Sequence, residues 1–449
     1  MKGNKRNIIY LMLGQFISVF GGAILRFALS LFVLDVTGRA DVFATVLAIS
    51  SVPVLFAPIG GAIADRFDRK ILMVLMDVAN AIIAALLFLV VGTSESILGI
   101  GILIFILAIV GSFDTPVVGA SIPLLVEEHE LEKINGLSNG ILQLSNVVAP
   151  IIGGIFYGLM GAKLLVASSI VFFVIAAIVE SFLKIPFEKR ERTTGTVMEI
   201  LTADLKDGFK EVKNNQVIFK SIVIAAAINF VLTSFFIVGL PIILRMTLRV
   251  NDTMYGIGMG VFSLSSIVGA ILAGPLTKNL KFNNFYRVFT YSGIILVITN
   301  ILLSMTSASI GFMVVLIMEI IIGMMLSAIS IYLISLVQKI TPKANLGKVM
   351  ATIIAVAQCA VPLGQLVMGL VFRNTTTNVF LPLLMISVFV LLISFVCFMM
   401  FRETKESDLK FQVQVSHLLK FIGYLVFVGY LAAKDSSDSS FNKHSRGVA

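Results

Sequence analysis

The sequence of 449 residues has little charge and no tryptophan. Only 13% of its residues are charged, whereas soluble domains carry about 25%. Hydrophobic residues make up 58% of the chain, and the mean hydropathy is +1.02. This composition excludes a single soluble core and indicates a protein that lies in a lipid bilayer.

Residues that bind metals or form disulfides are also scarce. The two cysteines, Cys359 and Cys397, lie in separate apolar runs and do not have a metal-binding or redox spacing. The three histidines are scattered, and His129 falls in the charged stretch "EEHELEK". We therefore expect no metal and no cofactor.

Long apolar runs fill most of the chain, and many reach the roughly 20 residues that a helix needs to cross a bilayer. The first run is too long for the core of a signal peptide and lacks a clear cleavage site, so we expect it to be retained. The expected spans are 8–35, 43–64, 71–91, 98–126, 136–160, 162–183, 218–244, 254–277, 285–306, 309–338, 346–371 and 378–401. The sequence thus predicts an all-α membrane protein of twelve transmembrane helices.

The basic residues follow the loops in a regular way. Of the 34 Lys and Arg, 21 fall in the amino terminus and the even-numbered loops, 7 in the carboxy-terminal tail and 5 in the odd-numbered loops. The positive-inside rule then predicts a multi-pass protein of the cell inner (cytoplasmic) membrane with both termini in the cytoplasm. The net charge of +9 is explained by this topology, so we expect no nucleic-acid partner.

A long polar segment divides the chain into two sets of six spans. Pro150 and Pro362 are separated by 212 residues, as are Gly111 and Gly323. Such offsets predict two six-helix bundles related by a parallel repeat, which in transporters hold substrate near the midplane between the halves. The expected parts are 1–184, the first bundle; 185–217, a cytoplasmic linker; 218–402, the second bundle; and 403–449, a cytoplasmic tail.

Two amphipathic segments are expected on the membrane surface. In the linker, apolar residues recur at helical spacing, which is typical of a helix that lies on the inner surface or acts only as a spacer. They are Val197, Ile200, Leu201, Leu205 and Val212. In the tail, "FIGYLVFVGYLAA" is too short to span the bilayer, so we expect an interfacial helix over 417–433.

The stretch "GGAIADRFDRK", residues 60–70, places five charges in six residues between two apolar runs. The glycines allow close helix packing, and the charges can pair across the boundary between the bundles. We predict that this stretch and the acid that follows it form a conformational latch, a set of contacts that stabilises one state. Its residues are Gly61, Asp65, Arg66, Asp68, Arg69, Lys70 and Asp77.

Another motif, "APIIGG", lies in the fifth span. Pro150 removes a backbone donor and is expected to bend the helix, whereas Gly153 and Gly154 allow close packing against a partner helix. The alternative interpretation is an ordinary kinked helix with a face of small residues.

These motifs resemble those of the major facilitator superfamily. "DRFDRKILMVLMD" and "IPLLVEEHELEKINGLSNGILQLSNVVAPIIGG" are similar to the bacterial macrolide-efflux permeases of that family. The resemblance implies transport by alternating access, and "APIIGG" resembles a motif of drug–proton antiporters, although Ala149 replaces the family's usual glycine. The arginine that many of these antiporters carry in the fourth span is absent from "AIVGSFDTPVVGA".

Ionisable residues inside spans cost about 2.5–3.5 kcal/mol each on insertion scales and are therefore candidate functional residues. We predict that Arg26 pairs with Asp114 and that Asp114 or Glu319 binds a proton; a static ion pair is the alternative. Asn229, Gln143 and Asn146 are candidate cavity residues. Glu180 and Lys184, four residues apart at the end of a span, are predicted to form a surface pair.

The sequence thus favours a secondary exporter of a bulky hydrophobic or amphiphilic compound such as a macrolide, driven by proton antiport and conferring antibiotic resistance. The expected partners are a small hydrophobic substrate, protons and the lipid bilayer, with the protein acting as a monomer. The alternatives are export of a native metabolite such as a siderophore or peptide, and uptake of a nutrient. An enzyme or a receptor is disfavoured, because the chain has no Walker loop and no HExxH or GxSxG motif.

Overall fold

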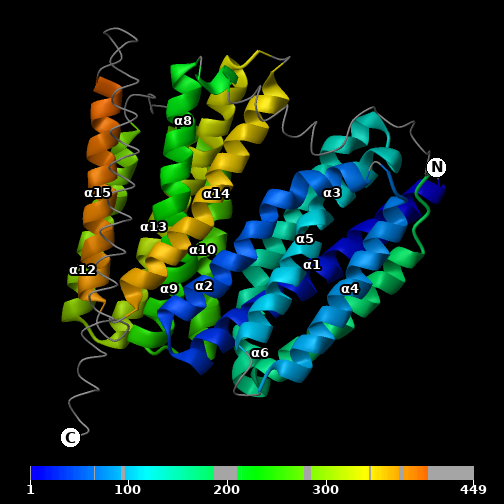
Figure 1. Ribbon diagram of the computed structural model, residues 1–449, viewed down its shortest axis with the longest axis horizontal. Coiled ribbons are helices and arrows are strands. Elements are labelled where there is room, and N and C mark those ends of the chain that lie inside the picture. Colours follow the sequence, from blue (N-terminus) through cyan, green and yellow to red (C-terminus); the bar gives the residue numbers. More distant parts are fainter. Residues whose placement is uncertain are drawn as a thin grey trace, which may run out of the picture.

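The structure is a computed structural model in which almost all described residues are helical (Figure 1). It describes residues 2–64, 66–92, 97–186, 210–213, 215–277, 285–342, 345–373 and 379–402. Several predictions lie outside these residues: Asp65 of the latch, the linker positions Val197, Ile200, Leu201 and Leu205, and the interfacial helix at 417–433.

The helices of the first half run from the amino terminus to residue 181. They are α1 (Lys2–Thr37), α2 (Ala40–Ser51), η1 (Val52–Phe56), α3 (Ala57–Ala64), α4 (Arg69–Val90), α5 (Ile97–Ser121), η2 (Ile122–Leu124), η3 (Glu128–Glu130) and α6 (Leu131–Ser181).

The helices of the second half begin at residue 216. They are α8 (Gln216–Ala227), η4 (Ile228–Thr233), η5 (Phe235–Gly239), α9 (Leu240–Ile242), η6 (Ile243–Thr247), α10 (Asp252–Ile271), α11 (Ala273–Thr277), α12 (Tyr286–Met305), α13 (Ala308–Ile340), α14 (Leu346–Phe372) and α15 (Phe380–Arg402).

Twelve helices cross the membrane, as the sequence predicts. In the part of the chain that the structure describes, ten apolar helices are long enough to cross a bilayer. One of them, α6, contains two of the expected spans, which are joined at Gly161 with φ 76° and ψ 172°. The remaining span consists of α2, η1 and α3 in succession. The all-α, two-bundle fold is therefore confirmed.

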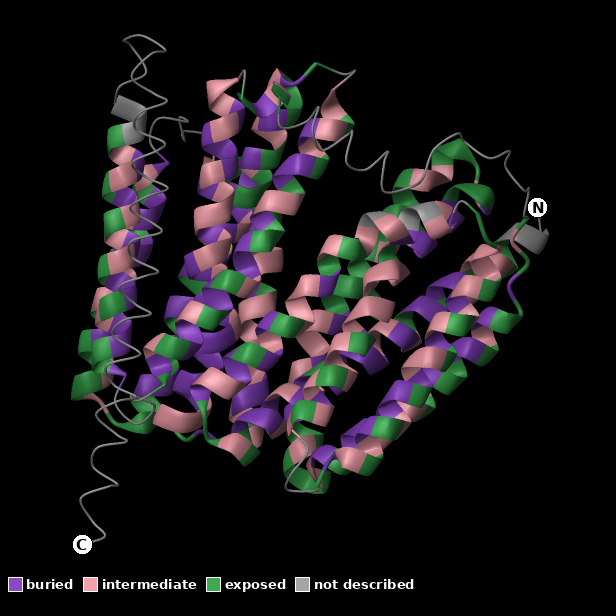
Figure 2. Ribbon diagram, viewed as in Figure 1, coloured by how far each residue is buried: buried purple, intermediate pink, exposed green. Residues whose placement is uncertain are grey.

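The two bundles meet at one end and diverge at the other, and the amino terminus lies at the diverging end (Figure 1). Two helix pairs pack across the boundary between the bundles, α6 with α10 and α2 with α14. Figure 2 shows that buried residues are dense where the bundles meet. We call the meeting end the closed end and the other the open end.

Polar side chains cap the helices that follow turns. The carboxylate of Asp68 accepts hydrogen bonds from the backbone N–H groups of Lys70 and Ile71, at 2.9 and 3.4 Å, and so caps α4. Asn251 caps α10 by accepting a bond of 2.8 Å from the N–H of Met254. Such caps satisfy N–H groups that have no partner within the helix.

Candidate functional site

Arg26 lies about two-thirds of the way along α1, deep in a membrane-crossing helix, yet its side chain is exposed. Its neighbours Leu25 and Phe27 are buried, with exposures of 0% and 6%. A charged side chain that faced lipid at this depth would be unfavourable by several kcal/mol. The exposed side of α1 at Arg26 therefore faces the space between the bundles rather than lipid.

Asp114 on α5 lies close enough to Arg26 for the two charges to attract each other. The two side chains do not form an ion pair within 4.0 Å in the described structure, and Asp114 is half-buried. The predicted neighbourhood of these residues is thus present, but the direct pair is not. The two charges act on each other across a gap.

The open side of the first bundle continues along α5 and α6. A Cβ atom added at Gly111, Gly119, Gly136 or Gly140 would meet nothing within 4 Å. Gln143, one turn beyond Gly140 on α6, is exposed, and Asn146 is half-buried. Both amides lie in the half of α6 that has moved away from α10, where a ligand could reach them.

The second bundle contributes Asn229 and Glu319 in different ways. Asn229 lies in the π-helical segment η4, and its amide donates to the carbonyl of Ala357 on α14 at 3.0 Å. It therefore links two helices of its own bundle. Glu319 on α13 is fully buried, and neither of its carboxylate oxygens has a hydrogen-bond partner within the described chain. In this conformation Glu319 does not face the space between the bundles.

The charged stretch forms a turn between α3 and α4 at the open end. Gly61 lies near the end of α3, and Arg66 is exposed in the turn. The carboxylate of Asp68 forms the helix cap described above, and the Nε of Arg69 donates to the carbonyl of Ala64 at 3.0 Å. Lys70 is half-buried in the first turn of α4. These printed contacts of the stretch are local to the turn.

The proline–glycine motif lies at the boundary between the bundles. Gly154 faces Gly256 of α10 so closely that an added Cβ would overlap the backbone carbonyl of Asp252. Gly153 faces the ring of Phe27 on α1, inside its own bundle. Pro150 lies one turn before Gly154 within the continuous helix α6. The small residues thus allow backbone-to-backbone packing of α6 on α10, as in other close helix pairs.

A group of four polar side chains, Asp35, Tyr157, Arg245 and Asp252, joins the bundles at the closed end; we call it the outer cluster. The guanidinium of Arg245 donates two hydrogen bonds to the carboxylate of Asp35, at 2.6 and 2.9 Å. It also pairs with Asp252 at 2.8 Å. The hydroxyl of Tyr157 donates to Asp35 at 3.2 Å. Such bidentate Arg–carboxylate contacts are among the stronger polar interactions.

A second ionic contact crosses the boundary nearby. The Nε of Arg373, after α14, lies 3.4 Å from the carboxylate of Asp41 on α2. Arg39 binds the same carboxylate at 2.7 Å from within its own bundle. The sequence analysis assigned none of these closed-end contacts, because charges at the ends of spans are usual and their partners are more than 200 residues away.

Asp77 and Glu180 lie in the interior of the first bundle, with exposures of 3% and 2%. The hydroxyl of Ser18 on α1 donates to Asp77 at 2.6 Å. The predicted surface pair of Glu180 and Lys184 is wrong. Helix α6 ends at Ser181, so the helical spacing does not reach Lys184, and Glu180 turns towards Gly14 of α1.

Comparison with known proteins identifies the family. The sequence pattern of the Major Facilitator Superfamily matches residues 11–364. The chain belongs to the major facilitator superfamily. This membership confirms the resemblance of the charged stretch and of the proline–glycine motif, and it makes the chain a multi-pass membrane transporter rather than a protein of an enzyme family.

Two relatives within the major facilitator superfamily are named as exporters. Macrolide efflux protein A of Streptococcus pyogenes is 25% identical over 403 residues, which cover 88% of this chain and 96% of the relative. A protein of Bacillus subtilis (strain 168) named as a bacilysin exporter is 28% identical over 305 residues, covering 67% and 72%.

Solved structures of the superfamily share the fold. A bacterial homologue of the iron transporter ferroportin in an inward-facing state matches with a TM-score of 0.64 and 17% identity, covering 89% of this chain and 99% of that one. An outward-facing structure with the same description matches with a TM-score of 0.55 and 19% identity, covering 88% and 99%.

Proposed function

We propose that this transporter exports a bulky hydrophobic or amphiphilic compound by alternating access, coupled to proton movement in the opposite direction. The observation that carries the proposal is the exposed Arg26, deep in a span, with the half-buried Asp114 near it. The names of the two relatives support export, and the macrolide-efflux relative supports a macrolide-like substrate that confers antibiotic resistance.

The proposed orientation places both termini in the cytoplasm and the protein in the inner membrane, as the distribution of basic residues indicates. The open end then faces the cytoplasm, and the described conformation is inward-facing. The outer cluster would stabilise this state, whereas contacts of the charged stretch across the boundary would belong to the outward-facing state. A single copy in the lipid bilayer suffices for this cycle.

In the proposed cycle, Asp114 and Glu319 are the candidate proton carriers. A carboxyl group that is alternately exposed and enclosed can bind a proton on one side and release it on the other. Arg26 would compete with the proton for Asp114 through its charge. Gln143 and Asn146 would provide hydrogen bonds to a substrate that enters from the open end.

The test is export of a panel of hydrophobic antibiotics from cells that express the wild type, Asp114→Asn or Glu319→Gln. The proton gradient is collapsed in parallel samples. Glu132→Gln, which changes an exposed acid in the first turn of α6, is the matched control. We expect gradient-dependent export that is lost, by about tenfold or more, in at least one span variant and kept in the control.

Two results would contradict the proposal. Export that persists without a gradient would exclude proton coupling, and the absence of export of every compound, with the protein present in the membrane, would exclude a drug of this class. The bilayer transporter would then be tested for export of a native metabolite, a second candidate that the bacilysin-exporter relative favours.

A further inference from the structure

The first bundle contains two buried acids that the proposed substrate path does not use. Asp77 on α4 and Glu180 on α6 both approach α1, the first through Ser18 and the second through Gly14. A Cβ at Gly14 would lie 2.6 Å from the Cγ of Glu180, so only glycine leaves room for this side chain. We call Asp77 and Glu180 the acid pair.

The hydrogen bonds of the acid pair are incomplete. Ser18 donates to one oxygen of Asp77, but Oδ2 of Asp77 and Oε2 of Glu180 have no partner among the residues that the structure describes. The side-chain oxygen of Asn80, one turn beyond Asp77, also lacks a donor. A buried carboxylate oxygen without a donor is unfavourable, whereas a proton on one acid would provide the missing donor.

The charges around the acid pair are unbalanced. Asp77, Glu180 and Asp114 repel one another electrostatically, and Asp114 is the member that Arg26 attracts. The pair's listed electrostatic partners, from the helices packed around it, are therefore acids and the hydroxyl of Ser18. Two neighbouring acids that both lost their protons here would carry two negative charges without a cation beside them.

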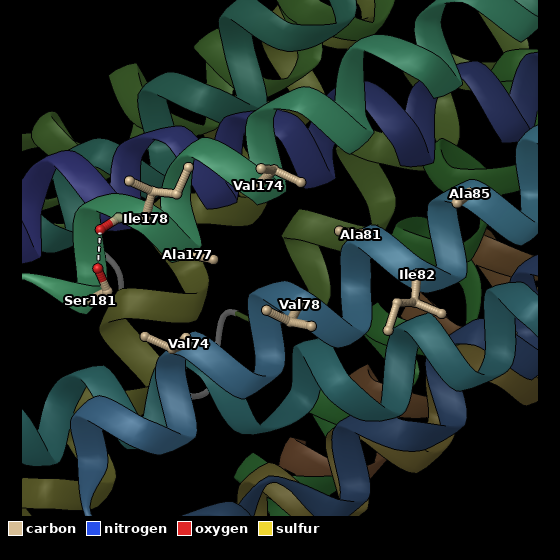
Figure 3. A pocket seen from close by; sticks show the side chains of 9 residues that line it. All are labelled: Val74, Val78, Ala81, Ile82, Ala85, Val174, Ala177, Ile178 and Ser181. Atoms are coloured by element: carbon tan, nitrogen blue, oxygen red, sulfur yellow. Dashed lines mark hydrogen bonds between the residues drawn. The ribbon is translucent and has the colours of Figure 1, made fainter.

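The side of α4 and α6 that faces lipid gives the acid pair no contact with water. Figure 3 shows a groove of about 490 Å³ between these helices, lined by aliphatic side chains and Ser181. The hydroxyl of Ser181 donates to the carbonyl of Ile178 at 2.6 Å and so does not serve the acids. Asp114, which is half-buried, is the acid that connects the pair with the space between the bundles.

We propose that Asp77 and Glu180 form a proton-binding site that holds one proton between them and exchanges it through Asp114. The proton occupies Oδ2 of Asp77 or Oε2 of Glu180, the two oxygens without a donor. The site lies behind α1, apart from Arg26, Gln143 and Asn146. This inference deepens the proposed proton coupling and rests on it only for the use of the proton in transport.

Infrared difference spectroscopy of the purified full-length protein in lipid nanodiscs tests the site without any substrate. The pH is changed, and the carbonyl stretch of protonated carboxyl groups is recorded. We expect a pH-dependent band that disappears in both Asp77→Asn and Glu180→Gln and that persists in Glu132→Gln. Two acids that share one proton titrate together, so each single change should remove the shared signal.

Ser18→Ala provides a second measurement if either substitution disturbs folding, because it leaves both acids in place. Loss of the hydroxyl that donates to Asp77 should shift the frequency of the band without removing it. Bands that are identical in the wild type, Asp77→Asn and Glu180→Gln, or a wild-type band unmoved by Ser18→Ala, would overturn the proposal. Failure to export any drug would leave the spectra unaffected, so the two proposals can fail separately.

Discussion

The two ends of the molecule differ in how the bundles are held together. At the closed end, α6 and α10 touch through glycine backbones, and Arg245 binds carboxylates of both bundles. At the open end, glycines of the same helix α6 face empty space, and the printed contacts of the charged stretch remain within its own turn. The difference teaches that this conformation is stabilised mainly from one end.

Gly154→Leu is expected to have the largest effect on this difference. A side chain at Gly154 would overlap the backbone of α10, and overpacking of this kind costs about 1–3 kcal/mol or more. The closed end should therefore open. Distances between spin labels at the ends of α6 and α10, measured in a Cys359→Ser and Cys397→Ser background, should lengthen.

Gly140→Leu is the matched control for Gly154→Leu, because both residues lie on α6 and a side chain at Gly140 meets open space. Its label distances should remain those of the parent protein. If both variants lengthened the distances equally, the packing of Gly154 against Gly256 would not be what holds this end closed.

Arg245→Gln is expected to have the next largest effect. The change removes the ion pairs to Asp35 and Asp252 and leaves two partly buried acids facing each other. A loss of about 1–3 kcal/mol would reduce the population of the closed end roughly 5- to 150-fold. The same spin-label distances measure this change. Arg249→Gln, an exposed neighbour with the same charge, should leave them unaltered.

Arg373→Gln is expected to have the smallest effect. The contact with Asp41 is longer, at 3.4 Å, and Arg373 is 38% exposed, so solvent screens it. We expect a loss below about 1 kcal/mol. Arg39→Gln, which removes the partner of Asp41 within the bundle, provides the comparison. A change from Arg373→Gln as large as that from Arg245→Gln would show that the two ionic contacts share the closed end equally.

Much of the fold could be predicted from the sequence, because long apolar runs and loop charges report membrane helices directly. The pattern also identified Arg26 and Asp114, since ionisable residues are rare inside spans. It could not predict the π-helical turns from Ile228 onward, which depend on tertiary contacts such as that of Asn229 with α14.

The closed-end contacts and the acid pair were beyond the reach of the sequence for different reasons. Asp35 and Arg245 lie at the ends of spans, where charges are common, and nothing local relates residues 210 positions apart. Glu180 was assigned to the surface because Lys184 follows at helical spacing. The helix ends before that lysine, and the burial of Glu180 depends on the glycine at position 14 of another helix.

The turn at Gly161 has a mechanical consequence. It joins the two halves of α6 with a single residue at positive φ and no intervening loop, so the chain has no slack there. The first half touches the opposite bundle at Gly154, and the second half carries Glu180. A displacement that separates the bundles at the closed end would therefore be transmitted along α6 to the acid at its far end, as through a bent lever.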